Sequence, residues 1–309
     1  KQAIVTPLLK KSSLPPIFKN YRPVSNLSFI SKLTERAVAH QFTEYLAAND
    51  LYEKFQSAYR PCHSTETALL RVTSDIHTDM DSQRVVLLVL LDLSAAFDTV
   101  DHNILLQRLS DIGVTDAAHS WFKSYLSDRT QSVNINGTSS GPQRLKFGVP
   151  QGSVLGPILF TIYTAPLGIV IRTHNFDFHL YADDTQLYIR VIPNQSVVDD
   201  SLSSLESCIH DIRLWMIANL MKLNDDKTEF MIIGNPAQIS KFSLSAVTVG
   251  SDTVECAHSA RNLGVILDTR MSMDKQVSAL VKSVNYQLYN ISKIRKYITK
   301  SSCELLVNA

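Results

Sequence analysis

Three aspartates stand where carboxylates can do chemistry. Asp92 directly follows Val85–Leu91, an unbroken run of valine and leucine that suits a strand buried on both faces. Asp183 and Asp184 lie between two segments of alternating apolar residues, which predicts a β-hairpin with both carboxylates at its tip. A carboxylate at the end of a buried strand costs free energy unless it is paired or bound to a metal. Two adjacent aspartates repel each other, and a divalent cation relieves that repulsion.

These carboxylates would converge if the strands that carry them were neighbours in one sheet. Asp92 and Asp183 could then hold two Mg²⁺ ions about 4 Å apart, the arrangement that polymerases and nucleases use for in-line displacement. Mg²⁺ suits such a site because it combines a few carboxylates with phosphate oxygens of a substrate. A structural interpretation stays open, since Asp-Asp is common in turns, where the side chain caps its own backbone.

The composition allows a large core and excludes disordered or collagen-like chains, because 45% of the 309 residues are hydrophobic and 19% are charged. The net charge of +1, from 30 basic and 29 acidic residues, does not by itself indicate a nucleic-acid binder. The charge is unevenly spread, however, at +5 over residues 1–60, −6 over 61–200 and +2 over 201–309. Lys275–Lys300 contains six basic residues and no acidic one.

Other chemistries lack their motifs. The four cysteines are far apart with no CxxC pair, which favours a reduced, intracellular protein. The nine histidines show no zinc-ligand spacing, and neither a Gly-x-Ser-x-Gly nucleophile motif nor a Walker loop is present. No signal peptide and no membrane span is expected: Val149–Ile171 is apolar but contains three glycines and three prolines, which predicts a loop followed by a buried helix.

Hydrophobic periodicity predicts a mixture of helices and short strands. Helical spacing occurs at Phe29–Leu46, Thr65–Met80, Ile104–Ile112, Ala117–Leu126, Val198–Met216 and from Met273 onward. Besides Val85–Leu91, strands are expected at Ser132–Ile135, Leu145–Val149, Phe176–Leu180, Leu187–Val191, Phe230–Ile233, Phe242–Val249 and Leu263–Leu267. Hairpins rather than a regular strand–helix–strand rhythm indicate an α+β fold.

An ordered series of motifs resembles the reverse transcriptases. Leu91–Asp98 (LDLSAAFD), Gly148–Pro157 (GVPQGSVLGP) and Tyr181–Asp184 (YADD) resemble three successive palm motifs of that family. Further segments resemble fingers and later palm motifs of non-LTR (LINE-type) retrotransposon enzymes, namely Asn20–Ser25, Phe55–Arg60, His63–Thr67, Leu223–Thr228 and Asn262–Val265. Tyr-x-Asp-Asp alone is a weak signal, whereas the ordered set covers nearly the whole chain.

The resemblance implies an α+β right-hand polymerase with an antiparallel palm sheet. Residues 1–83 would form the fingers, interleaved with the palm, and residues 84–270 would form the palm. Residues 271–309 would begin a thumb, which we expect to be truncated. The chain would then be a piece of a longer polyprotein or a decayed genomic copy.

The same resemblance implies a metal site. Asp92 and Asp183 resemble the metal-binding aspartates, with the Leu93 carbonyl as a backbone ligand and Asp184 as the third carboxylate. Two Mg²⁺ ions, with Mn²⁺ as a possible substitute, would act on the primer 3′-hydroxyl and on the triphosphate. Lys227 resembles a lysine that protonates the departing pyrophosphate, although a solvated turn lysine is equally open.

The resemblance also assigns five nucleotide-binding residues, and Leu93, the backbone metal ligand, is one of them. Phe97 corresponds to an aromatic that blocks a ribose 2′-hydroxyl, which is compatible with a place in the core. Gln151 and Gly152 resemble the turn that lines the nucleotide pocket, with an ordinary proline-initiated turn as the alternative. Arg60 resembles an arginine that clamps the triphosphate, or is a surface arginine; it stands here in Ala58–Arg60 (AYR) rather than in the commoner Gly-Phe-Arg.

The implied activity is RNA-directed DNA synthesis. An RNA template, a DNA primer and dNTPs would be the partners, with no membrane, and the basic run from Lys275 would either follow template–primer phosphates or form a solvated helix face. The resemblance suggests a ribonucleoprotein of the cytoplasm and nucleus, and the sequence predicts no oligomeric state.

One alternative function is that of an inactive remnant that only binds nucleic acid or a protein. Another alternative is an RNA-dependent RNA polymerase. Asp98 could mimic the second aspartate of that family, but Phe97 and Pro150–Gly152 favour the reverse transcriptase.

Overall fold

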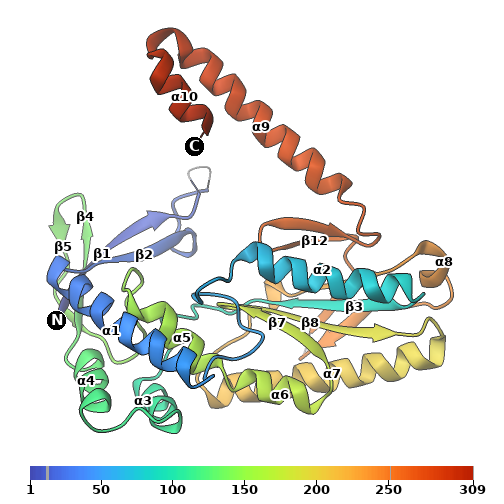
Figure 1. The fold of residues 1–309 in the computed structure, drawn as a ribbon, viewed down its shortest axis with the longest axis horizontal. Coiled ribbons are helices and arrows are strands. Elements are labelled where there is room, and N and C mark those ends of the chain that lie inside the picture. Colours follow the sequence, from blue (N-terminus) through green and yellow to red (C-terminus); the bar gives the residue numbers. More distant parts are fainter. Residues whose placement is uncertain (12–13, 251, 309) are drawn as a thin grey trace.

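The computed structural model describes residues 1–11, 14–250 and 252–308, and an antiparallel sheet lies at its centre (Figure 1). The strand order is β7-β8-β3-β9, and each neighbouring pair is antiparallel. The bounds are β7 Asp177–Tyr181, β8 Asp184–Val191, β3 Val85–Leu91 and β9 Glu229–Ile233. Both faces of this sheet are covered, by α2 on one side and by α6 and α7 on the other.

The central strand β3 shows why its residues form a buried strand. Val86 and Leu88 point into one core cluster, with α2, while Leu87 and Val89 point into the other, with α5 and α7. Since side chains alternate between the two faces of a strand, both faces must be apolar when both are covered. The unbroken run of valine and leucine is the sequence signature of this position, and the predicted strand is confirmed with its bounds.

A second sheet lies beside the first and joins distant parts of the chain. β1 pairs antiparallel with β2 and parallel with β4, so the N-terminal hairpin packs against a segment more than 100 residues later. Its strands are β1 Gln2–Leu9, β2 Tyr21–Asn26, β4 Thr130–Ile135, β5 Thr138–Ser139 and β6 Gln143–Arg144. Residues on both sides of position 84 therefore share one sheet.

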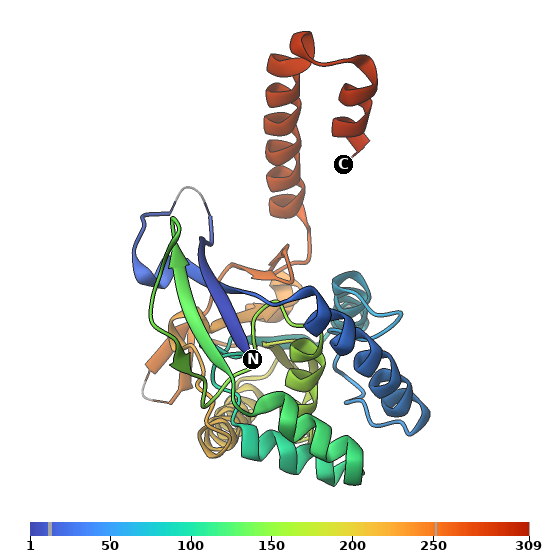
Figure 2. The same cartoon turned by 90° about the vertical axis from the view of Figure 1, so that its left-hand side faces the viewer.

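The remaining elements are helices and two small ribbons. The helices are α1 Phe29–Ala48, α2 Thr65–Asp81, α3 His102–Asp111, α4 Asp116–Leu126, α5 Leu155–Thr164, α6 Leu167–Thr173, α7 Gln195–Ala218, α8 Pro236–Ile239, α9 Asp274–Ile294 and α10 Lys300–Asn308. The ribbons pair β10 Ala246–Val249 with β11 Asp252–Glu255, and β12 Ser259–Asn262 with β13 Val265–Asp268. α9 projects from the body, and none of its side chains is buried (Figure 2).

The six predicted helices are confirmed, but the strand at Leu145–Val149 is wrong. This segment passes beside the loop after β3 without joining a strand ladder. Gly148 has φ +86°, and its N–H donates to the Val100 carbonyl at 2.7 Å, while the Val149 N–H donates to the Phe97 carbonyl at 2.9 Å. The left-handed glycine turns the chain and ends the alternation that the apolar residues suggested.

Two other sequence expectations need correction. The apolar segment after Val149 forms two helices, α5 and α6, because Pro166 interrupts it. By length and composition Leu155–Thr173 could cross a membrane, but 67% of this window is buried inside the structure, where it packs on the sheet. Of the strand expected at Phe242–Val249, only the last four residues are β-structure. Short elements such as β11 and α8 carry too few residues for a periodic signal.

A buried glutamate joins α1 to the start of α5. Glu35 is 1% exposed, and its Oε2 accepts hydrogen bonds from the backbone N–H groups of Val154 at 2.7 Å and Leu155 at 3.2 Å. Ser31 donates to the other carboxylate oxygen. These N–H groups belong to the first turn of a helix, which has no internal acceptors for them, so the carboxylate acts as a cap supplied by another helix.

Glu35→Ala should therefore lower the free energy of unfolding by about 3 kcal/mol, because two charge-assisted hydrogen bonds are lost and the N–H groups stay buried. Urea unfolding followed by tryptophan fluorescence measures the change. Glu44→Ala is the matched control, since Glu44 lies on the same helix with its side chain exposed. Equal effects of the two substitutions would contradict the capping role.

Candidate active site

The register of the central sheet places Asp92 beside Asp184. β3 and β8 are antiparallel, with Leu91 opposite Thr185 as the last pair. The next position of each strand holds an aspartate, so the two carboxylates meet at the same end of the sheet. Each strand alone would expose a single carboxylate; only their pairing creates an acidic site.

The hairpin of β7 and β8 adds the third carboxylate. Tyr181 pairs with Asp184, which leaves Ala182 and Asp183 as a two-residue turn. Ala182 has φ +55°, a conformation that tight hairpin turns require and that favours glycine over alanine. The turn projects Asp183 at the tip, next to the strand end that carries Asp92.

Burial and mutual repulsion raise the pKa values of this pair. Desolvation raises the pKa of Asp184 to about 6, and the charges of Asp183 and Asp92 add to the effect. Desolvation and the charge of Asp92 also raise the pKa of Asp183. Lys227 opposes both shifts. The site therefore holds more negative charge than its surroundings neutralise, which favours a cation.

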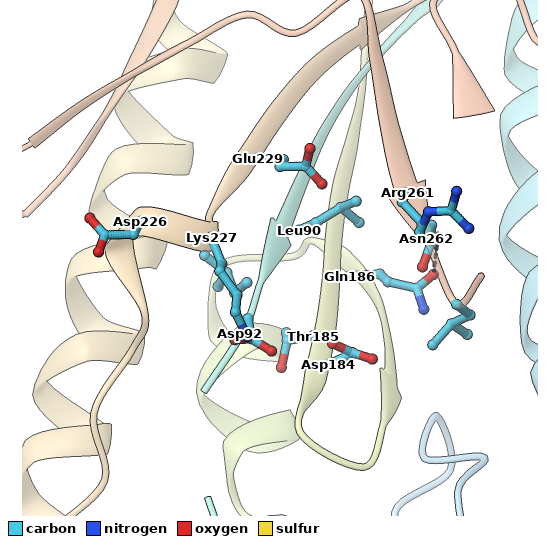
Figure 3. A pocket seen from close by; sticks show the side chains of 12 residues that line it. Leu90, Asp92, Asp184, Thr185, Gln186, Asp226, Lys227, Glu229, Arg261 and Asn262 are labelled. Atoms are coloured by element: carbon cyan, nitrogen blue, oxygen red, sulfur yellow. Dashed lines mark hydrogen bonds and ion pairs between the residues drawn. The ribbon is translucent and has the colours of Figure 1, made fainter. Parts of the chain in front are cut away.

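Asp92 is held by two neighbours from the segment before β9. Lys227 Nζ lies 2.7 Å from Asp92 Oδ2 (Figure 3), and Asn224 Nδ2 donates to the same oxygen at 3.2 Å. The Asn224 backbone N–H also donates to the Asp92 carbonyl at 2.9 Å. The lysine balances the charge of Asp92, while the asparagine fixes the orientation of its carboxylate.

The donor set fits a hard divalent cation. Within the part of the chain that the structure describes, no three His, Cys, Asp or Glu side chains lie close enough to hold a metal by themselves. The carboxylates of Asp92, Asp183 and Asp184 offer oxygen atoms alone, which Mg²⁺ prefers, and leave positions for substrate oxygens. The raised pKa values of Asp183 and Asp184 mark the repulsion that such a cation would relieve.

A cavity of about 600 Å³ opens beside Asp183 and Lys227. Four residues that sequence analysis assigned to nucleotide binding line it, namely Leu93, Phe97, Gln151 and Gly152. The Phe97 ring stacks on Phe160, with ring centroids 4.7 Å apart. Phe160 is fully buried, so the wall-forming ring is held rigidly by the core. The two interpretations of Phe97, core aromatic and cavity wall, both describe its position.

The turn at Gln151 is held from two sides. Its Nε2 donates to Asp98 Oδ1 at 3.2 Å and Oδ2 at 3.1 Å, and its carbonyl accepts from the Ser25 N–H at 2.8 Å. Loss of hydration raises the pKa of Asp98, and the bond from Gln151 opposes this shift. Gly152 has φ +105°, and a Cβ there would lie 3.0 Å from the Ser25 carbonyl oxygen. The close approach of this turn to β2 therefore requires glycine.

Among the residues predicted to bind the nucleotide, Arg60 is the one that does not line this cavity. Its guanidinium lies over the Tyr52 ring, 4.9 Å from the centroid. Tyr59, with φ +57°, lines the cavity instead. Arg22 of β2 lines it as well, and its charge lowers the pKa of Asp183. Arg22 and Asn224 lie in segments that resemble the family's motifs, but no pattern in the sequence predicted a role for either residue.

Asp92 and Asp184 line a second cavity of about 360 Å³, which extends along the sheet to the β12–β13 ribbon (Figure 3). Here Asn262 Nδ2 donates to Oε1 of the buried Gln186 at 2.9 Å. This bond ties the β12–β13 ribbon across β8, two residues from Asp184. The ribbon is thereby fixed at the edge of the acidic site.

The raised pKa of Asp184 predicts a pH-dependent gain in stability for Asp184→Asn. Because the folded state holds the proton more tightly than the unfolded chain, the charged carboxyl destabilises the fold above pH 6. The gain should be full above pH 6, on the order of 1–2 kcal/mol after solvent screening, and should vanish as the pH falls through about 4. Thermal unfolding at pH 8 and pH 4 without divalent cations measures it. Asp200→Asn, at an exposed position of α7, should show no such dependence.

The fold resembles that of solved telomerase structures. The apo telomerase of Candida tropicalis superposes with a TM-score of 0.57 at 13% identity, covering 88% of this chain and 48% of that one. The form truncated from its C-terminal domain gives 0.54 at 14% identity, over 86% and 55%. At such identities the likeness establishes the α+β fold alone.

Sequence comparison identifies the family. Residues 8–267 match the model of the reverse transcriptase (RNA-dependent DNA polymerase) family, and the chain belongs to it. It is 29% identical to a probable RNA-directed DNA polymerase from transposon BS of Drosophila melanogaster, over 85% of this chain. It is 26% identical to the polymerase from mobile element jockey of Drosophila funebris, over 91%. The chain is thus a reverse transcriptase domain related to non-LTR retrotransposon enzymes, and it spans 29–30% of these relatives' length.

Proposed function

We propose that this chain catalyses RNA-directed DNA synthesis as the reverse transcriptase domain of a LINE-type retrotransposon. It would add dNTPs to the 3′-hydroxyl of a DNA primer paired with an RNA template. The observation that carries this proposal is that Asp92, Asp183 and Asp184 lie at the same end of one sheet, where Asp183 lines a cavity large enough for a nucleotide.

The carboxylates would hold two Mg²⁺ ions, or Mn²⁺ as a substitute, together with the carbonyl of Leu93. Bound ions of this kind lower the pKa of an attacking hydroxyl and stabilise the charge of a leaving pyrophosphate. The protein's part is to aim the oxygens: the β3–β8 register aligns Asp92 with Asp184, and the hairpin turn brings Asp183 to them.

The cavity wall would orient the nucleotide. Phe97 would exclude a 2′-hydroxyl, and the second amide hydrogen of Gln151 could reach ribose or phosphate while the first stays on Asp98. Arg22 lines the cavity and would contact the triphosphate, whereas Arg60 would first have to leave the Tyr52 ring. Lys227, whose Nζ contacts Asp92, would protonate pyrophosphate.

The wider organisation is part of the same proposal. Residues 1–83 would form most of the fingers, 84–270 the palm and 271–309 the beginning of a thumb. Strands β4–β6 complete the N-terminal sheet, which supports interleaved fingers and palm. Family resemblance further suggests a ribonucleoprotein of the cytoplasm and nucleus, bound to the RNA template and the nicked DNA primer.

Extension of an oligo-dT primer on poly-rA tests the function directly. We expect dTTP incorporation that requires Mg²⁺ and is lost in Asp183→Asn. Incorporation of rUTP at the rate of dTTP would instead indicate an RNA polymerase. If the protein binds the primer–template but incorporates neither nucleotide, the inactive remnant becomes the better description. Incorporation that survives Asp183→Asn would refute the metal-site assignment.

A further inference from the structure

The segment after Glu53 runs along the outer edge of the catalytic hairpin. The Leu180 N–H donates to the Phe55 carbonyl at 2.8 Å, and the Ser57 N–H donates to the Leu180 carbonyl at 3.0 Å. These two bonds form a short parallel bridge next to β7. Residues 55–57 therefore extend the central sheet by one more strand-like segment, which continues directly into Tyr59 at the cavity.

Gln56, in the middle of this segment, reaches the turn itself. Its side chain is 3% exposed, and Oε1 accepts hydrogen bonds from the N–H groups of Ala182 at 3.1 Å and Ala58 at 2.8 Å. Ala182 is the first residue of the two-residue turn and directly precedes Asp183. One buried amide oxygen thus holds both the hairpin tip and the fingers segment.

The turn needs such an anchor for two physical reasons. Ala182 adopts a left-handed conformation, which costs a residue with a Cβ roughly 1 kcal/mol. The tip also carries adjacent carboxylates at the same end of the sheet as Asp92, and like charges so placed repel one another. This repulsion favours a turn that moves Asp183 away from Asp92, and the strain at Ala182 makes the observed turn less stable. The bond from the Ala182 N–H to Gln56 opposes that movement.

We propose that Gln56 is a positioning residue that fixes the hairpin turn so that Asp183 faces Asp92. Through Ala58 the same side chain links the metal-binding tip to the segment that carries Tyr59. A change in the position of that segment would then change the separation of the carboxylates. This inference rests on the proposed function, but it concerns cation binding and can be tested without catalysis.

Gln56→Met tests the inference because methionine has nearly the same volume and no strong acceptor. Ser57→Ala is the matched control: it removes the 2.9 Å contact between Ser57 Oγ and His179 Nε2 on the same seam and leaves the turn untouched. Mn²⁺ binding to each protein is measured from the free-ion signal in electron paramagnetic resonance. We expect about 10-fold weaker binding for Gln56→Met, as for other residues that orient metal ligands, and no change for Ser57→Ala.

Kinetics give an independent readout. For Gln56→Met the Mg²⁺ concentration at half-maximal rate should rise about 10-fold and kcat should fall, whereas KM for dTTP should stay within about 3-fold. If Gln56→Met fails to fold, Gln56→Asn, which draws the acceptor back by one methylene, should shift Mn²⁺ binding in the same direction. Wild-type Mn²⁺ affinity in a folded Gln56 variant would overturn the inference. An inactive wild-type protein that binds Mn²⁺ would count against the proposed function alone.

Discussion

Asp92→Asn should reduce dTTP incorporation by about 1,000-fold or more, equivalent to about 4 kcal/mol of transition-state stabilisation. Asparagine keeps the size of the side chain and can still accept from Asn224, so the end of β3 should keep its shape. The charge that faces Asp183 and Asp184 is lost, however, and with it a ligand for a divalent cation. Single-turnover primer extension on poly-rA measures the chemical step.

Two controls make the result for Asp92 specific. Asp200→Asn removes an aspartate from an exposed helical position and should leave the rate unchanged. Thermal unfolding should show that Asp92→Asn is folded, although Lys227 loses its charged partner. A folded Asp92→Asn protein that extends the primer at the wild-type rate would contradict the assignment of this carboxylate.

Phe97→Val should increase the use of rUTP relative to dTTP by about 100-fold, because the shorter side chain leaves room for a 2′-hydroxyl in the cavity wall. The ratio of the two kcat/KM values measures the change. The rate with dTTP should fall less than in Asp92→Asn, because Phe97→Val alters no group that would contact a cation.

Phe160→Leu separates the cavity wall from the packing behind it. It removes the ring on which Phe97 stacks but leaves Phe97 in place. The selectivity ratio should therefore shift in the same direction by a smaller factor. If Phe97→Val leaves the ratio unchanged while lowering stability, Phe97 serves only the core.

The parts of the site that were predictable from sequence depend on local patterns. Val85–Leu91 identified its strand because both faces are buried, so its apolar run begins and ends with the strand. The alternation on either side of Asp183 identified the hairpin, and the motif order supplied the pairing of the two elements. Once β3 and β8 are neighbours, the position of Asp92 follows from the register.

The parts that escaped prediction depend on contacts between distant segments. Gln56 gains its role from a turn 126 residues later in the chain, and no periodic pattern marks such a bond. The direction of the Arg60 side chain depends on the backbone at Tyr59, where a positive φ turns the chain so that Tyr59 and Arg60 point to different places. Leu145–Val149 alternates like a strand, but the backbone of the loop after β3 takes its hydrogen bonds. The spacing of apolar residues indicates which side chains are buried. The bond from Gln56, the direction of Arg60 and the path of Leu145–Val149 depend on the direction of the backbone instead.

The projecting helix α9 divides the molecule into parts of different local stability. None of its 21 residues is buried, so its helical state depends on helix–coil equilibrium more than on tertiary packing. Its amide protons should exchange with solvent through fraying within the native state, whereas those of β3 should exchange only through global opening. We therefore expect that the protein does not melt as one unit and that a midpoint measured in the core describes the sheets but not this helix.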